Sequence, residues 1–204
     1  MKNLEKVVSR IETELDEKDQ IREIALKSSR AIVRLAGGIL KGMHRDESPG
    51  GSLEELRDEV SRLTNLLTEH PDVANAGYVE NALQEYTEVG IVMAVLERGD
   101  VPSPEDLGVG SVPYLLGLGD TIGELRRFCL DDLRTGRADR AAERLDQMEE
   151  LTGAIMRFDY PDAIVAIRKK QDVARSLLEK TRGEMTVAMS NRQLSDRLDE
   201  LLKK

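Results

Sequence analysis

Apolar residues recur along most of the chain at intervals of three and four positions, the spacing of one face of an α-helix. In no segment do apolar and polar residues alternate for long enough to predict a strand. Proline and glycine divide the pattern into about seven segments, for which we predict helices. Their approximate limits are residues 3–45, 52–70, 72–97, 113–134, 138–158, 161–182 and 191–202. The pattern therefore predicts an all-α bundle with a long first helix, forming a single domain over residues 1–204.

Local signals at the segment ends support these limits. Ser52 and Glu55 have the spacing of a capping box, and Pro113 suits the first residue of a helix. Gly136 suits a C-terminal stop. We expect a single helical turn beginning at Ser103, inside the only long loop, residues 98–113.

The composition agrees with a helical protein that is soluble. Hydrophobic residues make up 40% of the chain and aromatic residues only 3%, which disfavours a β-sandwich or barrel. The single cysteine, Cys129, excludes an internal disulfide and indicates a reducing compartment; we expect it to be a small buried hydrophobe. The longest uncharged stretch, residues 107–119, is too short and too rich in glycine to span a bilayer. We therefore expect a cytoplasmic protein with no membrane contact.

The first helix presents several distinct faces. Its core face is predicted to include Ile21, Ile24, Ala25, Ala31, Ile32, Leu35 and Ile39. Leu26, Val33 and Leu40 form a second apolar seam, for contact either within the fold or with another subunit.

A cationic stripe runs along another side of the same helix. The net charge of −9 makes the whole molecule repel nucleic acid, so binding would need a local concentration of cations. At about 100° per residue, five cations fall within roughly 60° of one another along about 27 Å. They are Lys27, Arg30, Arg34, Lys41 and Arg45. The stripe is either an ordinary solvated face or a surface that follows the phosphates of a single strand.

Two pairs of carboxylates lie at helical spacing. Glu85 and Glu88 are three residues apart, and Asp120 and Glu124 are four residues apart. If their helices pack side by side, the four carboxylates could converge and would then need a cation. Without a nearby His or Cys, this oxygen donor set suits Mg²⁺ or Mn²⁺, and metal-bound water can attack a phosphodiester. The alternative is that the four residues are solvated surface acids.

Three glycines surround the second acidic pair. Gly117, Gly119 and Gly123 each cost about 1 kcal/mol inside a helix relative to alanine. They indicate close helix packing or a ligand near the backbone, unless Gly117 and Gly119 belong to an irregular helix start. By contrast, we interpret the basic run 168–170 as a solvated surface, with contact to RNA as the alternative.

Several of these segments resemble the translin family, and in particular its catalytic branch, translin-associated factor X. PYLLGLGDTIGELRRFCLDDLRTG, residues 113–136, is similar to the family's Asp-x-x-Gly-Glu-Leu core and its flanks. LQEYTE, residues 83–88, resembles the paired-glutamate helix of the catalytic branch. Residues 16–45 and 161–183 are similar to the family's first and late helices. The resemblance is collinear from about Leu15 to Arg182.

The resemblance implies a fold, an assembly and an activity. Family members are all-α proteins that form hollow octamers with the active site and basic residues facing the interior, and the catalytic branch cuts single-stranded RNA with Mg²⁺. Glu85, Glu88 and Asp120 match the catalytic carboxylates, and Glu124 matches a further acid beside the metal. The cationic stripe falls where the family contacts RNA.

We therefore expect a Mg²⁺-dependent endoribonuclease that acts on single-stranded RNA with weak sequence preference, and that also accepts single-stranded DNA as a ligand. The chain lacks the long insertion of the eukaryotic catalytic subunit, so we expect a homo-oligomer, an octamer, of one chain type. The alternative is a non-catalytic protein of the translin type that binds single-stranded RNA or DNA.

Overall fold

The computed structural model describes residues 3–202, and these residues form eight helices and no strand. The helices are α1 (Leu4–Met43), α2 (Gly50–Leu67), α3 (Pro71–Ala74), α4 (Gly77–Leu96), α5 (Pro104–Leu107), α6 (Ser111–Arg134), α7 (Ala138–Ile155) and α8 (Ile167–Leu202). The predicted all-α class is confirmed. The chain divides into two compact units, residues 1–86 and 87–204, with the boundary inside α4. Each unit is described by itself.

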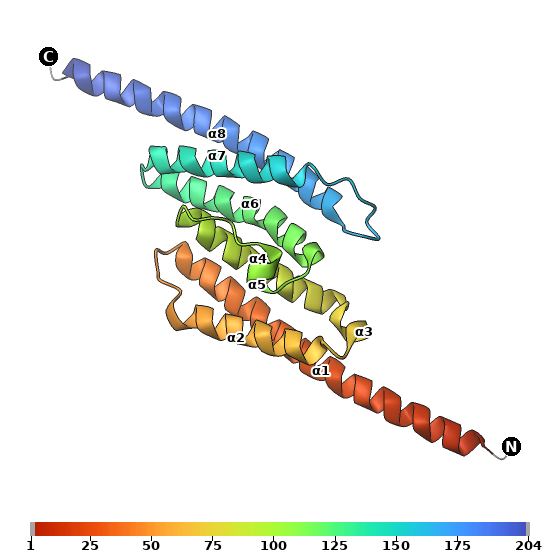
Figure 1. Cartoon of the computed structure of the whole chain (residues 1–204). Helices are drawn as coiled ribbons and strands as arrows, with labels where there is room; N and C mark the ends of the chain where they lie inside the picture. Colours follow the sequence, from red (N-terminus) through yellow and green to blue (C-terminus); the bar gives the residue numbers. More distant parts are fainter. Residues whose placement is uncertain (1–2, 203–204) are drawn as a thin grey trace. The chain divides into compact units, whose positions relative to one another are not determined.

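The first unit is built on a helical hairpin of α1 and α2, with α3 against both (Figure 1). On α1 the buried apolar residues Ala25, Ile32 and Ile39 recur every seven positions. On α2 the buried residues are Leu56, Val60, Leu63 and Leu67, at the spacing of one helix face. Of the predicted core face of α1, Ile24 is wrongly placed, because it is 52% exposed. The buried stripe of α1 is therefore narrower than the core face that the apolar pattern predicts.

The N-terminal part of α1 extends past α2 within this unit (Figure 1). Residues 3–20 are all exposed, including the large apolar side chains Leu4, Ile11 and Leu15. Near the end of this part, the Lys18 ammonium pairs with the Asp72 carboxylate of α3 at 3.0 Å.

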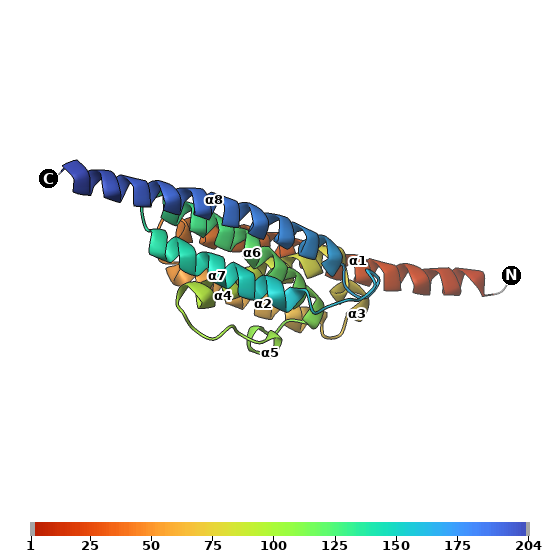
Figure 2. The same cartoon turned by 90° about the horizontal axis from the view of Figure 1, so that it is seen from above.

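The second unit packs α6, α7 and α8 side by side, as both views show (Figure 1, Figure 2). Its main core cluster takes residues from these three helices and from the second half of α4. The buried members are Ile91, Val95, Leu118, Ile122, Leu125, Met148, Leu151, Ile155, Ala174 and Leu178. Aliphatic side chains thus supply the core, as the low aromatic content predicts.

Cys129 lies in a neighbouring cluster of the second unit and is fully buried. Its thiol donates a hydrogen bond to the carbonyl oxygen of Ala141 at 3.3 Å. Burial raises the pKa of the Cys129 thiol to about 11. The expectation of a small buried hydrophobe is confirmed.

Two sets of predicted helix limits are wrong, and in both cases the residues near the boundary explain the difference. The segment predicted as one helix over 72–97 is divided into α3 and α4, and the Asn75 side chain donates to the carbonyl oxygen of Pro71 at 2.9 Å where α3 ends. The segments predicted over 161–182 and 191–202 belong to the single helix α8, which begins only at Ile167 and continues through Gly183. A glycine costs less than a proline in a helix interior, so good helix formers on both sides keep α8 continuous.

Of the predicted signals at helix ends, the cap at Ser52 is wrong, and those at Ser103 and Gly136 are confirmed. Ser52 does not cap α2, because that helix begins earlier, at Gly50, and its N-terminus has no side-chain cap. The predicted turn at Ser103 is α5, where Ser103 and Asp106 form a reciprocal capping box. Gly136 has φ +75°, a left-handed conformation that suits the predicted stop after α6.

In the part of the chain that the structure describes, no helix combines the length and the apolar character that crossing a membrane requires.

Candidate active site and cationic face

Helix α4 carries the first acidic pair. Glu88 is buried, with only 8% of its surface exposed, and Glu85 is half-buried. A carboxylate that loses its water needs hydrogen bonds or a cation to remain ionised. The alternative that these residues are solvated surface acids is therefore wrong for Glu88. Glu85 lies in the first unit, whereas Glu88 lies in the second unit together with α6.

Helix α6 carries the second pair in a partly covered position. The side chains of Asp120 and Glu124 are 28% and 21% exposed. At about 100° per residue they lie on the side of α6 opposite Ile122 and Leu125, which face the core. Glu124 is 3.9 Å from the Arg127 guanidinium on the same helix, a long and weak contact.

Asp120 is held by a lysine from α8. The Lys170 ammonium nitrogen lies 2.5 Å from Oδ1 of Asp120, and the Lys170 side chain is 25% exposed. This ion pair is less solvated than most of the pairs on the surface, such as Arg168 with Asp159, whose side chains are 64% and 91% exposed.

Gly119 explains how Lys170 comes so close to α6. A Cβ atom added at Gly119 would lie 2.9 Å from Cβ and 3.2 Å from Cγ of Lys170, which is too close for any real contact. Gly123 has no such constraint, since its added Cβ would make ordinary contact with Leu177 at 3.8 Å. Because α6 is a regular helix from Ser111 to Arg134, the alternative of an irregular start at Gly117 and Gly119 is wrong. Close helix packing is the reason for Gly119.

The structure places Glu88, Asp120 and Glu124 on two helices that share one core. Ile91 and Val95, on the same side of α4 as Glu88, pack in the same cluster as Leu118 and Ile122 of α6. Among the described residues, however, no three His, Cys, Asp or Glu side chains are gathered closely enough to hold a metal ion. The oxygen donors suit Mg²⁺ chemically, but the cation beside Asp120 is the Lys170 ammonium.

The predicted cationic stripe lies on the surface of the first unit. Lys27, Arg30, Arg34 and Lys41 are exposed on α1 and span about 21 Å of helix. Arg45 is also exposed but lies beyond the end of α1. Its guanidinium makes two contacts of 2.9 Å with the Glu47 carboxylate. Arg45 is therefore not part of the helical stripe, which we define as these four α1 residues and call the cationic face.

Two grooves between α1 and α2 border the cationic face. One, of about 470 Å³, is lined by Lys27, Arg34 and Arg62 but also by Glu55 and Glu59. Glu59 accepts a hydrogen bond from Ser28 at 2.6 Å, so its position is fixed.

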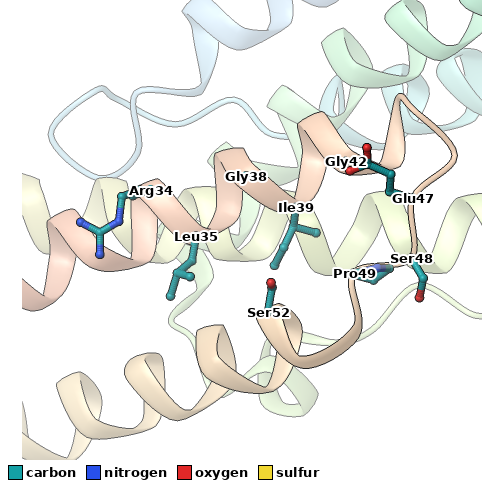
Figure 3. A pocket seen from close by; sticks show the side chains of 9 residues that line it. All are labelled: Arg34, Leu35, Gly38, Ile39, Gly42, Glu47, Ser48, Pro49 and Ser52. Atoms are coloured by element: carbon teal, nitrogen blue, oxygen red, sulfur yellow. The ribbon is translucent and has the colours of Figure 1, made fainter.

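The other groove, of about 230 Å³, lies where the chain turns from α1 into α2 (Figure 3). Leu35 and Ile39 project toward α2, while Arg34 lies at the far end of the groove from Glu47 and Ser48 (Figure 3). Of the residues that line this second groove, Arg34 is the one that carries positive charge.

Lys170 is the residue at this site that sequence reasoning missed. The run Arg168, Lys169 and Lys170 suggests a solvated surface, and Arg168 and Lys169 are indeed exposed. The signal for Lys170 is its register, since it lies three residues after Ile167 and four before Ala174, both of which are buried. Lys170 therefore belongs to the inner side of α8.

Taken together, the fold and the site define an all-helical protein with acidic residues on two neighbouring core helices and a separate cationic helix face. The chain belongs to the translin family, whose family model matches residues 16–183. An uncharacterized protein of Methanocaldococcus jannaschii is 31% identical over 188 residues, which cover 90% of this chain and 83% of that protein.

Similar solved structures carry the name C3PO. The crystal structure of AfC3PO has a TM-score of 0.76 at 28% identity, and the structure of an AfC3PO complex with duplex RNA has a TM-score of 0.74 at 27% identity. Each match covers 91% of this chain and 98% of the other. The apo form of NeC3PO has a TM-score of 0.80 at 22% identity, covering 89% of this chain and 96% of that one, a likeness of fold alone.

Proposed function

We propose that this translin-family chain is a Mg²⁺-dependent endoribonuclease of the catalytic-branch type, acting on RNA as a homo-oligomer, an octamer. Glu85, Glu88 and Asp120 are the proposed catalytic residues, and together with Glu124 they are the proposed metal ligands. Mn²⁺ can take the same place, since it accepts the same oxygen ligands.

The observation that carries this proposal is the burial of the acids on adjoining helices. Glu88 is buried, and Asp120 and Glu124 are largely covered, in one unit of the fold. Carboxylates in such positions cost free energy unless hydrogen bonds or a cation accompany them, and a divalent cation is the partner that several such acids can share. The ammonium beside Asp120 supports the view that this place accepts positive charge.

In this proposal the acidic residues bind the metal and the cationic face binds the RNA. Glu88, Asp120 and Glu124 would hold the metal from α4 and α6, with Glu85 as a fourth ligand from the preceding turn of α4. Mg²⁺ bound there supplies an activated water and stabilises the charge that develops on the phosphate. The cationic face of α1 would hold the RNA through its phosphates, so sequence preference is expected to be weak. The scarcity of aromatic side chains leaves little base stacking.

Whether the protein cuts single-stranded or duplex RNA has to be tested. The family resemblance supports single strands, whereas the AfC3PO complex contains duplex RNA. We propose that single-stranded RNA is the substrate, with single-stranded DNA as a ligand, and that duplex RNA binds to the cationic face without being cut.

A non-catalytic nucleic-acid-binding protein is the second candidate. The ion pair between Asp120 and Lys170 favours it, because this lysine occupies an oxygen that the metal would need. This candidate predicts salt-sensitive RNA binding that persists in a chelator and no cleavage under any metal condition.

Incubation of the purified protein with end-labelled single-stranded RNA separates the two candidates. We expect cleavage with Mg²⁺ or Mn²⁺, none with EDTA, and binding in both. Glu88→Gln and Asp120→Asn should each lose cleavage by at least about 100-fold while RNA binding is retained.

The matched control variants are Glu97→Gln and Asp100→Asn, which make the same chemical changes at exposed positions. They should cleave as the unaltered protein does. RNA binding without cleavage by the unaltered protein would establish the non-catalytic candidate.

A further inference from the structure

Lys170 is the fourth residue of α8 and crosses α6 at Gly119. The clash that an added Cβ at Gly119 would make involves Cβ and Cγ of Lys170, which lie next to the α8 backbone and cannot swing away. The base of the lysine side chain is therefore fixed by the contact of the two helices. Only its terminal part can move.

That terminal part is directed at Asp120. The ammonium donates a charge-assisted hydrogen bond to Oδ1 of Asp120, and both side chains are about three-quarters covered. The adjacent cations behave differently, since Lys169 is exposed and Arg168 pairs with the exposed Asp159. The arrangement is specific to Lys170.

A divalent cation and an ammonium compete for the same carboxylate. Both need an oxygen of Asp120, and two positive charges a few ångströms apart repel each other strongly where water is partly excluded. Lys170 can withdraw along its flexible terminal carbons, but its base remains at Gly119, so its charge stays near the site.

We propose that Lys170 is a positioning residue that holds Asp120 while no metal is bound and that competes with the divalent cation for this carboxylate. The inference rests on the proposed function, because it takes Asp120 as a metal ligand. Lys170 accordingly lowers the affinity of the site for Mg²⁺ or Mn²⁺.

Direct measurement of Mn²⁺ binding tests the proposal without relying on activity. Free Mn²⁺ is quantified by its electron paramagnetic resonance signal in titrations of the full chain without RNA. Lys170→Met should bind Mn²⁺ about tenfold more tightly than the unaltered protein. Lys170→Arg, which keeps the charge and the carbons that lie across Gly119, should stay close to the unaltered affinity.

Lys169→Met is the matched control, with the same loss of charge at an exposed position, and its affinity should remain within about twofold of the unaltered value. If Lys170→Met does not fold, as judged by its helical circular dichroism, Lys170→Gln replaces it in the same comparison.

The outcomes distinguish a failure of the proposed role of Lys170 from a failure of the proposed metal site. If Asp120→Asn weakens Mn²⁺ binding but Lys170→Met leaves it unchanged or weaker, the metal site stands and the role of Lys170 is overturned. If neither Asp120→Asn nor Glu88→Gln changes Mn²⁺ binding, the proposed metal site itself fails, and the inference fails with it.

Discussion

At the scale of single residues, Gly119 shows how one missing methyl group positions a functional side chain. The glycine lets the first turn of α8 approach α6 closely enough for Lys170 to reach Asp120. Its neighbour Gly123 lies on the same helix but is not required by packing, because an added Cβ would make only an ordinary contact there. The two glycines thus offer a controlled comparison within α6.

We expect Gly119→Ala to lower the free energy of unfolding by about 1 kcal/mol. The substitution gains about 1 kcal/mol of helix propensity, but the overpacking against Lys170 typically costs about 1–3 kcal/mol. Gly123→Ala makes the same chemical change without the clash and should raise the free energy of unfolding by up to about 1 kcal/mol. Urea denaturation followed by circular dichroism measures both. Equal stabilisation by the two variants would show that α6 and α8 do not need the close approach.

At the scale of helices, the cationic face depends on the regularity of α1. Arg30 and Arg34 are one turn apart and exposed, and neither forms an ion pair with another described residue. Their charges therefore remain available for an anionic ligand. Arg45, by contrast, is already engaged by Glu47.

Replacement of Arg30 and Arg34 together by glutamine should weaken binding of single-stranded RNA and reduce its salt dependence. Loss of two phosphate contacts should lower the slope of log K against log salt by about 1.4. Fluorescence anisotropy over a range of salt concentrations measures the slope. The control is Arg157→Gln with Lys180→Gln, an equal loss of charge at exposed positions of the second unit, which should leave the slope unchanged. The role of α1 would be refuted if both double variants gave the unaltered slope.

Helices were the most predictable feature because their signals are local. The 3.6-residue period identified α1, α2, α6 and α7 to within a few residues, and the capping residues identified α5. The division between α3 and α4 and the continuity of α8 do not follow from the proline and glycine signals, because the Asn75 side chain closes α3 and Gly183 does not interrupt α8.

The candidate site was predictable in its composition but not in its contacts. Helical spacing selects Glu88, Asp120 and Glu124, and the structure adds that Glu88 is buried. The pairing of Asp120 with Lys170 joins residues fifty positions apart in sequence. No spacing rule within one helix reveals such a contact, although the register of Lys170 beside Ile167 points inward.

At the scale of the whole molecule, the proposed homo-oligomer requires a surface for contact between subunits. The last turns of α8 expose Val187, Leu194, Leu198 and Leu201, at intervals of seven, four and three residues. This is the spacing of a coiled-coil seam, and exposed seams of this kind are typical of contacts between subunits. We assign them to the proposed homo-oligomer.

Leu194→Ser combined with Leu198→Ser should therefore yield a smaller assembly. Removal of two large apolar groups from a buried seam should cost several kcal/mol per contact, enough to dissociate it at micromolar concentration. Light scattering coupled to size-exclusion chromatography gives the molar mass. Val173→Ser, at an exposed position near the start of α8, is the control and should leave the mass unchanged. An unaltered mass for the double variant would place the subunit contacts elsewhere.

Helix α8 is one uninterrupted rod of 36 residues, about 54 Å long. Lys170, which pairs with Asp120, lies near the beginning of α8, and the apolar seam lies near the end of α8. If the seam is a subunit contact of the proposed homo-oligomer, a single helix supplies both the contact between neighbouring copies and the cation beside Asp120.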